Sequence, residues 1–219
     1  MRGCWAGKKF RRRRSCTRAS CSVGPNVKRW QVAGAPTDAQ LDEIASLLRS
    51  GGIVVLPTDT IYGLHGLPSE SERIAAIKYR HEEKRFLMIA ASIEQLRSIG
   101  VDVPSTLNEI WPAPMTAVLR RGASTIAARV PDLKWLRDLL ERTGPLISTS
   151  ANRSGDPPVA STDELRSDLL NAIDGVVDAG RREGKPSAIV DFTETEPRFI
   201  REGDPRFAQI LRKTLSKKL

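Results

Sequence analysis

The sequence predicts a single α/β domain built on a twisted mixed β-sheet flanked by helices. Short apolar runs of strand length alternate with segments of helical periodicity from about residue 36 to residue 216. Hydrophobic residues make up 40% of the 219 residues, which is enough for one sizeable core, and this stretch contains no repeat or linker. We therefore expect one folded domain over residues 36–216, preceded by a basic, disordered tail over residues 1–35.

Helix-capping signals and apolar spacing place the individual elements. Thr37 and Gln40 form a capping box in front of an apolar helical face that ends at Gly51 and Gly52. Three further pairs predict helix starts: Ser69 with Glu72, Ser92 with Gln95, and Ser161 with Glu164. Strands are expected at residues 53–56, 86–90, 115–119, 127–130, 146–147, 176–179, 187–191 and 198–201, and helices around 133–142 and 207–215.

The net charge of +9 comes from the N-terminal tail. Ten of the 35 Lys and Arg residues precede Asp38, the first acidic residue, which leaves 25 basic against 26 acidic residues in the remainder. A nearly neutral body argues against a large basic face for nucleic acid. The Arg-rich, Ser-containing, acid-free tail fits an organellar transit segment, a basic arm, or upstream codons read from a misassigned start.

The positions of the cysteines exclude several kinds of catalytic and metal site from the body of the protein. Cys4, Cys16 and Cys21 all lie in the tail, so the body offers no cysteine nucleophile, no cysteine-built zinc site and no disulfide framework. Two histidines are too few for most metal sites, and we expect no metal bound by the protein itself. No apolar run approaches the ~20 residues that cross a bilayer. We expect a cytoplasmic protein with no membrane association, or an imported one if the tail is a genuine transit segment.

Polar side chains gather where predicted strands end, which is where α/β proteins commonly place ligands. The strand at 53–56 runs into "PTDTIYGL", whose polar members are Thr58, Asp59, Thr60 and Tyr62. Side-chain hydrogen bonds within a turn are the simpler explanation for such a cluster. The alternative is that these residues form part of a ligand site.

Three cations, Lys78, Arg80 and Lys84, precede the apolar run at 86–90 in "KYRHEEKRF". A solvated helix end would explain them, but their anchorage beside a core strand would also let them bracket a polyphosphate. In "STSANRSG", residues 148–155, small polar residues follow a strand, and such a loop lets backbone N–H groups approach an anion. Three more candidates stand in or beside strands and could equally be edge residues: Arg129, Ser187 and Arg201.

Common catalytic motifs are missing from the sequence. It has no phosphate-binding Gly-x-x-x-x-Gly-Lys-Ser/Thr loop, no Gly-x-Gly-x-x-Gly fingerprint, no Ser-His-Asp order and no carboxylate pair of obvious catalytic spacing. A cation-rich pocket with hydroxyl groups and few titrating groups favours the binding and orientation of anions over general acid–base catalysis.

Seven segments together resemble the YrdC-like threonylcarbamoyl-AMP synthase family. They are "GGIVVLPTDTIYGL", "IKYRHEEK", "WPAPMTAVL", "TIAARVP", "PLISTSANRSG", "KPSAIVD" and "IREG", in the family's order and spacing over about residues 38–205. Each segment alone is weak, but coincidence does not explain seven in order. The resemblance implies the short, single-domain form of the family, with an open concave ligand cavity.

The resemblance also implies an activity, that of a nucleotidyltransferase in tRNA processing. L-Threonine and bicarbonate would give an N-carboxylated threonine, whose carboxylate attacks the α-phosphorus of ATP to form threonylcarbamoyl-AMP and release pyrophosphate. Mg²⁺ is expected with the nucleotide. A partner transferase complex would then move the threonylcarbamoyl group to the adenosine beside the anticodon of tRNAs that read codons beginning with A.

Carried over residue by residue, the resemblance assigns roles to the polar candidates. Lys78 and Arg80 would be the catalytic cations, Arg129 the partner of the threonine carboxylate, and Tyr62 part of the pocket wall. The residues expected to contact ATP are Lys78, Arg80, Lys84, Thr125, Asn152 and Arg201. Those expected to hold threonine are Thr60, Tyr62, Arg129, Ser150 and Ser187.

Four residues depart from the family pattern. Many members have proline where this chain has His81 and Arg85, some have a threonine-binding histidine where it has Ile89, and the usual glycine of the "WPGP" motif is Ala113. These departures bear on how the amino-acid pocket is built. Two other functions remain open from the sequence: an RNA-binding or ribosome-maturation factor of the same fold, with weak RNA binding, and a paralogue that activates a different carboxylated amine.

Overall fold

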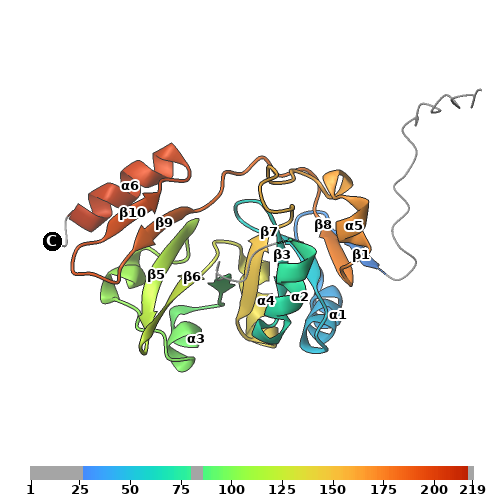
Figure 1. The fold of residues 1–219 in the computed structure, drawn as a ribbon, viewed down its shortest axis with the longest axis horizontal. Coiled ribbons are helices and arrows are strands. Elements are labelled where there is room, and N and C mark those ends of the chain that lie inside the picture. The colour runs from blue at the N-terminus through green and yellow to red at the C-terminus, as the bar shows by residue number, and fades with distance from the viewer. Residues whose placement is uncertain (1–26, 80–85, 217–219) are drawn as a thin grey trace, which may run out of the picture.

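The computed structural model describes residues 27–79 and 86–216, and it confirms an α/β domain with a mixed sheet flanked by helices (Figure 1). Ten strands form one sheet in the order β1-β8-β2-β3-β7-β4-β6-β5-β9-β10. The strands are β1 (Lys28–Gln31), β2 (Val54–Pro57), β3 (Tyr62–Gly66), β4 (Leu87–Ile89), β5 (Met115–Arg121), β6 (Ser124–Arg129), β7 (Leu146–Ser150), β8 (Gly175–Asp178), β9 (Ala188–Asp191) and β10 (Arg198–Arg201). The helices are α1 (Asp38–Arg49), α2 (Ser71–Ile77), α3 (Ile93–Ser98), α4 (Lys134–Thr143), α5 (Ser167–Leu170) and α6 (Pro205–Ser216).

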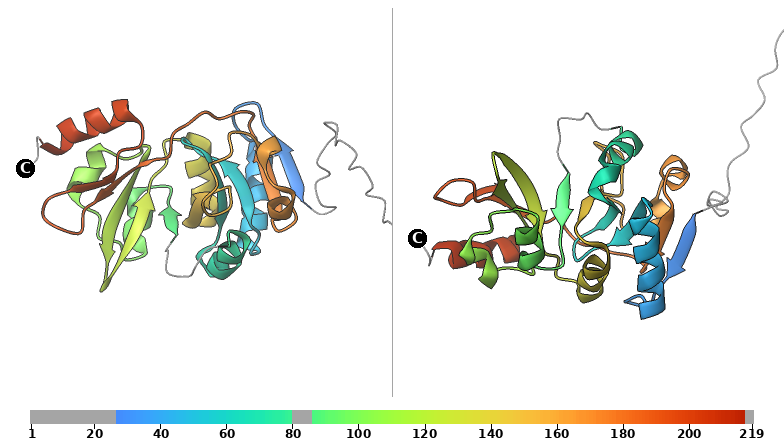
Figure 2. Two further views of the ribbon diagram at one scale, coloured as in Figure 1. Left: turned by 45° about the horizontal axis from the view of Figure 1, so that its top comes forward. Right: turned by 90° about the horizontal axis from the view of Figure 1, so that it is seen from below.

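One half of the sheet consists of β1, β8, β2, β3 and β7. Both of its faces are buried, because successive side chains along the central strands pack into clusters on opposite sides. Val54 and Leu56 of β2 point to a cluster formed with α1 and α4, while Val55 between them points to a cluster with Ile74 of α2 and Leu169 of α5. A strand buried on both faces reads as a continuous apolar run, which is why 53–56 is detectable from sequence. Figure 2 shows α1 and α4 on one side of this half and α2 on the other.

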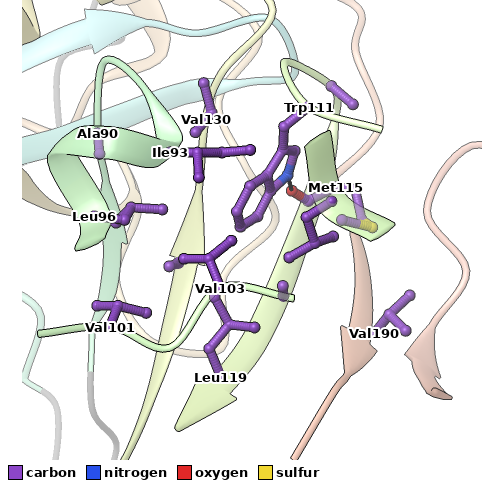
Figure 3. Close-up of a cluster of buried hydrophobic side chains, with 14 of the residues drawn as sticks. Ala90, Ile93, Leu96, Val101, Val103, Trp111, Met115, Leu119, Val130 and Val190 are labelled. Atoms are coloured by element: carbon purple, nitrogen blue, oxygen red, sulfur yellow. Dashed lines mark hydrogen bonds between the residues drawn. The ribbon is translucent and has the colours of Figure 1, made fainter. Parts of the chain in front are cut away.

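The second half of the sheet, with β6, β5, β9 and β10, has its core on a single face. Figure 3 shows the Trp111 indole among aliphatic side chains of α3, β5 and β9, including Ile93, Met115 and Val190. The indole N–H donates to the Met115 carbonyl at 2.9 Å, so its polar atom is satisfied inside the core. Thr116 on β5 and Ile189 on β9 alternate along their strands with residues of this core. Their side chains therefore face the opposite side of the sheet.

The connection from β8 to β9 joins the two halves. It leaves the first half at residue 179 and enters the second at residue 187, crossing the molecule above the sheet in the view of Figure 1. It passes so close to the turn before β3 that a β-carbon at Gly184 would lie 1.6 Å from the Thr60 carbonyl oxygen. Only glycine permits this approach. The connection between the two halves therefore packs directly against this turn.

The expected boundary between a disordered tail and the domain, at residue 35, is wrong. Lys28–Gln31 form β1, which pairs in parallel with β8, and Trp30 is buried against α1. The Trp30 indole donates to Glu43 at 3.0 Å, and Arg29 pairs with Asp178 at 3.4 Å. Long-range packing outweighs the basic, polar local sequence here. Residues 1–26 lie outside the described part of the chain.

Two capping predictions are confirmed and two are wrong. Thr37 forms the capping box with Gln40, and Ser92 accepts from the backbone N–H of Gln95. Ser69 instead lies in a 3-10 turn, Pro68–Glu70, that precedes α2. Ser161 precedes only a short 3-10 turn, and Glu164 accepts from the Ala160 N–H at 2.7 Å. Each predicted strand overlaps an observed one, but β3 occupies a segment for which the sequence favours a polar turn. No helix in the described residues is long and apolar enough to span a membrane.

Candidate functional site

A cavity of about 430 Å³ lies on the face of the second half-sheet opposite its core and extends onto β7 and the turn before β3. Strand register builds its floor. Ile89 of β4 pairs with Arg129 of β6, and Ile189 of β9 pairs with both Thr116 of β5 and Arg201 of β10. Because paired residues on neighbouring strands point to the same face, these five side chains line one side of the sheet, and all five line the cavity.

Arg129 is the buried cation of the cavity, with 4% of its surface exposed. Its guanidinium forms a close ion pair with Asp59 and donates to the Thr60 hydroxyl at 3.1 Å and to the Ala113 carbonyl at 3.3 Å. Asp59 in turn accepts from the Asp132 backbone N–H at 3.0 Å. A buried charge needs such partners, and they fix the guanidinium in place. A ligand carboxylate would therefore share Arg129 with Asp59.

The turn that precedes β3 is held by its own hydroxyls and also lines the cavity. Thr58 Oγ1 lies 2.7 Å from the Ile61 carbonyl, accepts from the Thr60 N–H at 3.1 Å, and lies 2.9 Å from Thr60 Oγ1. Thr58, Thr60 and Ile61 are all on the cavity wall. The turn and ligand-site interpretations of "PTDT" are thus compatible, since the hydrogen bonds of the turn set the direction of the Thr60 hydroxyl.

At the opposite wall, Arg201 is attached to Ser187. Its guanidinium donates to the Ser187 carbonyl at 2.9 Å and to the Ser187 hydroxyl at 3.3 Å, and that hydroxyl lies 2.9 Å from Thr116 Oγ1. Burial lowers the pKa of Arg201, and the positive charge of Arg129 lowers it further. In the described residues Arg201 forms no salt bridge, so its charge is not balanced by a carboxylate. This wall favours an anionic ligand.

The end of β7 forms the third wall. Ser150 donates to the Asn152 side-chain oxygen, and both residues line the cavity. Lys78 is buried behind them. Its ammonium group donates to the carbonyls of Ser150 and Asn152 at 2.5 and 2.6 Å and to Asn152 Oδ1 at 3.1 Å. Lys78 therefore holds the loop that carries two ligand candidates, and its own side chain is not on the cavity wall.

The structure brings six of the candidates from the sequence around one cavity: Thr60, Arg129, Ser150, Asn152, Ser187 and Arg201. Besides Lys78, it places two others elsewhere. Tyr62 is fully buried, and its phenol oxygen donates to the Gly180 carbonyl at 2.7 Å and accepts from the Ala179 N–H at 3.0 Å. Thr125 is exposed on β6, in the hairpin with β5. Arg80 and Lys84 lie outside the described residues, as do His81 and Arg85.

Sequence reasoning missed Thr116, and it named Ser148 and Asp59 only as members of polar clusters, without a role for either. Thr116 and Ser148 line the cavity, and Asp59 neutralises Arg129. Thr116 could have been found from alternation, because its neighbours Met115 and Ala117 are apolar and face the core. Ser148 alternates with Ser150 in the same way. The pairing of Asp59 with Arg129 gives no local signal, because 70 positions separate them in the chain.

The described residues offer few ligands to a metal ion. In the part of the chain that is described, no group of three or more His, Cys, Asp or Glu residues is arranged to hold a metal ion. Asp156 is the one acidic residue among the described residues that line the cavity. Mg²⁺ demands six oxygen ligands and is usually held by one or two carboxylates together with substrate phosphates.

Comparison with known proteins supplies relatives of similar length and at least one that is much longer. A family model described as "Telomere recombination", for Sua5, YciO and YrdC proteins, matches residues 46–203. The threonylcarbamoyl-AMP synthase of Stutzerimonas stutzeri is 31% identical over 179 residues, which cover 73% of this chain and 96% of that protein. The one from Pseudomonas syringae pv. syringae is 32% identical over 197 residues, covering 81% and 100%. The one from Pyrococcus abyssi is 31% identical over 83% of this chain, which spans only 56% of that protein.

Solved structures share the fold. Pyrococcus abyssi Sua5 complexed with L-threonine matches with a TM-score of 0.71 and 27% identity, over 81% of this chain and 57% of that one. YciO of E. coli matches with a TM-score of 0.73 over 83% of this chain and 98% of that one, and at 23% identity it supports the fold alone.

Proposed function

The chain belongs to the Sua5/YciO/YrdC family, and from this premise we propose that it is an L-threonylcarbamoyladenylate synthase. It would convert L-threonine, bicarbonate and ATP into threonylcarbamoyl-AMP and pyrophosphate. Two relatives named threonylcarbamoyl-AMP synthase align with 31–32% identity over nearly their whole length. The YciO match, which carries the fold alone, shows why the activity needs its own argument from the site.

One observation carries the proposal. Six candidate ligand residues from β6, β7, β10 and three connecting segments, up to 141 positions apart in the chain, line a single cavity. A stability requirement alone does not gather two arginines and several hydroxyl groups around an open space, because each buried polar group costs free energy unless it is paired. The volume of about 430 Å³ lies within the usual range for small-molecule sites.

The charges on the wall suit two reactants that repel each other. The carboxylated threonine and ATP are both anions, and they can approach only where cations offset their charge. Arg201 supplies a positive charge without a carboxylate partner, and Arg129 supplies one that Asp59 holds in a fixed direction. The carbamate is labile in water, so its capture in a recessed cavity beside the nucleotide matters more than a strong base.

We assign one set of the lining residues to threonine and another to ATP. Thr60, Arg129 and Ser187 would hold the amino acid, with Ser150 at the boundary, as in the family. Asn152 and Arg201 would contact the nucleotide, and Lys78 would act through the loop that it holds as well as through charge. Mg²⁺ would enter bound to the phosphates, where it neutralises part of their charge. The product would pass to a tRNA threonylcarbamoyl transferase complex.

The test is a pyrophosphate-release assay on the full chain. Pyrophosphate should appear only when ATP, L-threonine and bicarbonate are all present. Arg201→Ala should lower kcat/KM about a hundredfold, the usual effect of removing one group that stabilises developing charge. Arg198→Ala is the matched control, since Arg198 lies on the same strand, is exposed, and pairs with Asp191 outside the cavity.

Other results would replace the proposal. Turnover with another amino acid and not with L-threonine would indicate a paralogue that activates a different carboxylated amine. Absence of turnover together with tight, salt-sensitive RNA binding would indicate an RNA-binding factor of the same fold. Equal losses in Arg201→Ala and Arg198→Ala would show that the cavity is not the site.

A further inference from the structure

We propose that Ser148 is a further ligand-contacting residue, at the amino-acid end of the cavity, and that His65 is the residue that positions its hydroxyl. This inference rests on the proposed function for the identity of the ligand. It is carried by a buried pair on adjacent strands: His65 of β3 faces Ser148 of β7 in register, and His65 Nε2 lies 3.1 Å from Ser148 Oγ.

Packing alone does not explain a histidine at this position. His65 is completely buried, and its Nδ1 forms no hydrogen bond of good geometry in the part of the chain that is described, although the backbone carbonyls of Gly63 and Val54 lie close enough to act on the ring. A buried polar atom without a well-formed hydrogen bond lowers stability, whereas an apolar side chain of similar volume would not carry that cost. The contact that the imidazole does make is with a hydroxyl on the cavity wall.

The neighbouring glycine is matched to this ring. A β-carbon at Gly63 would lie 2.6 Å from Cε1 of His65 and 3.1 Å from Nε2. Gly63 pairs with Ser150, so the ring occupies the space that a side chain at position 63 would fill beneath the cavity. Gly63 itself lines the cavity, which shows that the imidazole lies directly behind its wall.

The pair lies beside other residues of the cavity. Ser148 lies two residues before Ser150 on β7, and it pairs with Leu87 of β4, two residues before Ile89. Ile89 is paired with Arg129, whose charge acts on the imidazole. A hydroxyl oxygen has both donor and acceptor capacity. Because His65 fixes one of these directions, the other is directed toward the ligand space in either tautomer of the ring.

The experiment is a calorimetric titration of L-threonine into the full chain without ATP, so that turnover does not enter. Ser148→Ala should weaken threonine binding about tenfold, the effect of one good hydrogen bond, and leave the Kd for ATP unchanged. His65→Leu should weaken threonine binding about threefold. In the double variant the loss should not exceed that of Ser148→Ala alone, because His65 acts through Ser148. Ile147→Val is the control, since Ile147 is buried on the same strand and faces away from the cavity.

The outcomes separate this inference from the proposed function. An unchanged threonine Kd in Ser148→Ala would overturn the inference, and additive losses in the double variant would overturn the positioning role of His65. Wild-type protein that binds threonine but releases no pyrophosphate would refute only the proposed activity. Wild-type protein that binds no threonine would refute both.

Discussion

Replacement of His65 by leucine should remove a large part of the acid sensitivity of the folded protein. Burial lowers the pKa of His65 to about 4, the backbone carbonyls of Gly63 and Val54 oppose this, and the charge of Arg129 adds to it. The folded state therefore keeps the imidazole neutral down to about pH 4, while in the unfolded chain it becomes protonated below its ordinary pKa of about 6.5. Between these values the unfolded state binds more protons, so stability falls as the pH falls.

The magnitude follows from the two pKa values. A difference of about 2.5 units at 1.36 kcal/mol per unit gives a loss of about 3 kcal/mol as the pH falls from 7.5 to 4. For a domain whose unfolding free energy is ordinarily about 5–15 kcal/mol, this loss is easily measured. Carboxylates also titrate near pH 4, but they are common to the wild type and the variant, so the difference between the two proteins isolates His65.

The assay is urea denaturation of both proteins at pH 7.5, 6 and 4, with the unfolding free energy taken at each pH. The wild type should lose about 3 kcal/mol more than His65→Leu between the extremes, and Ile147→Val should follow the wild type. If wild type and His65→Leu lose the same amount, the histidine is not held neutral by burial, and the argument fails.

Three further predictions concern stability and can be measured by denaturation at pH 7.5. Arg129→Met should cost about 3–5 kcal/mol because it leaves the Asp59 charge buried without a partner; adding Asp59→Asn should recover part of that loss, and simple additivity would contradict the pairing. Trp30→Ala should cost about 3–5 kcal/mol if β1 is an integral strand, whereas a loss under about 1 kcal/mol would indicate a loosely attached one. Thr37→Ala should cost about 1 kcal/mol through loss of the α1 cap, with Ser50→Ala, at the other end of the helix, as the comparison.

Local patterns in the sequence located most of the sheet. The run at 53–56 is visible because β2 is covered on both faces, and Ser92 is visible as a cap because its partner, Gln95, is three residues away. Ser69 and Ser161 show the same spacing without capping a helix. The local pattern permits a cap, and the path of the chain around it decides whether one forms.

The elements that were missed depend on distant partners. β1 has a basic, polar sequence, and it becomes a strand because β8 pairs with it and α1 covers Trp30. β3 contains Gly63, His65 and Gly66, which do not favour a strand by propensity. It is held between β2 and β7 in the middle of the sheet, where pairing on both sides outweighs local preference.

By itself, the sequence determined the α/β class, the order of most elements and a set of polar residues at strand ends, because each of these follows from spacing along the chain. The tertiary structure alone decided which of those residues lie around the same cavity. Register places Ile89, Arg129 and Arg201 on one face. Packing between distant segments buries Tyr62 in the core and holds the Lys78 ammonium group against the Ser150 carbonyl. These outcomes depend on contacts between residues far apart in the chain, and periodicity carries no information about such contacts.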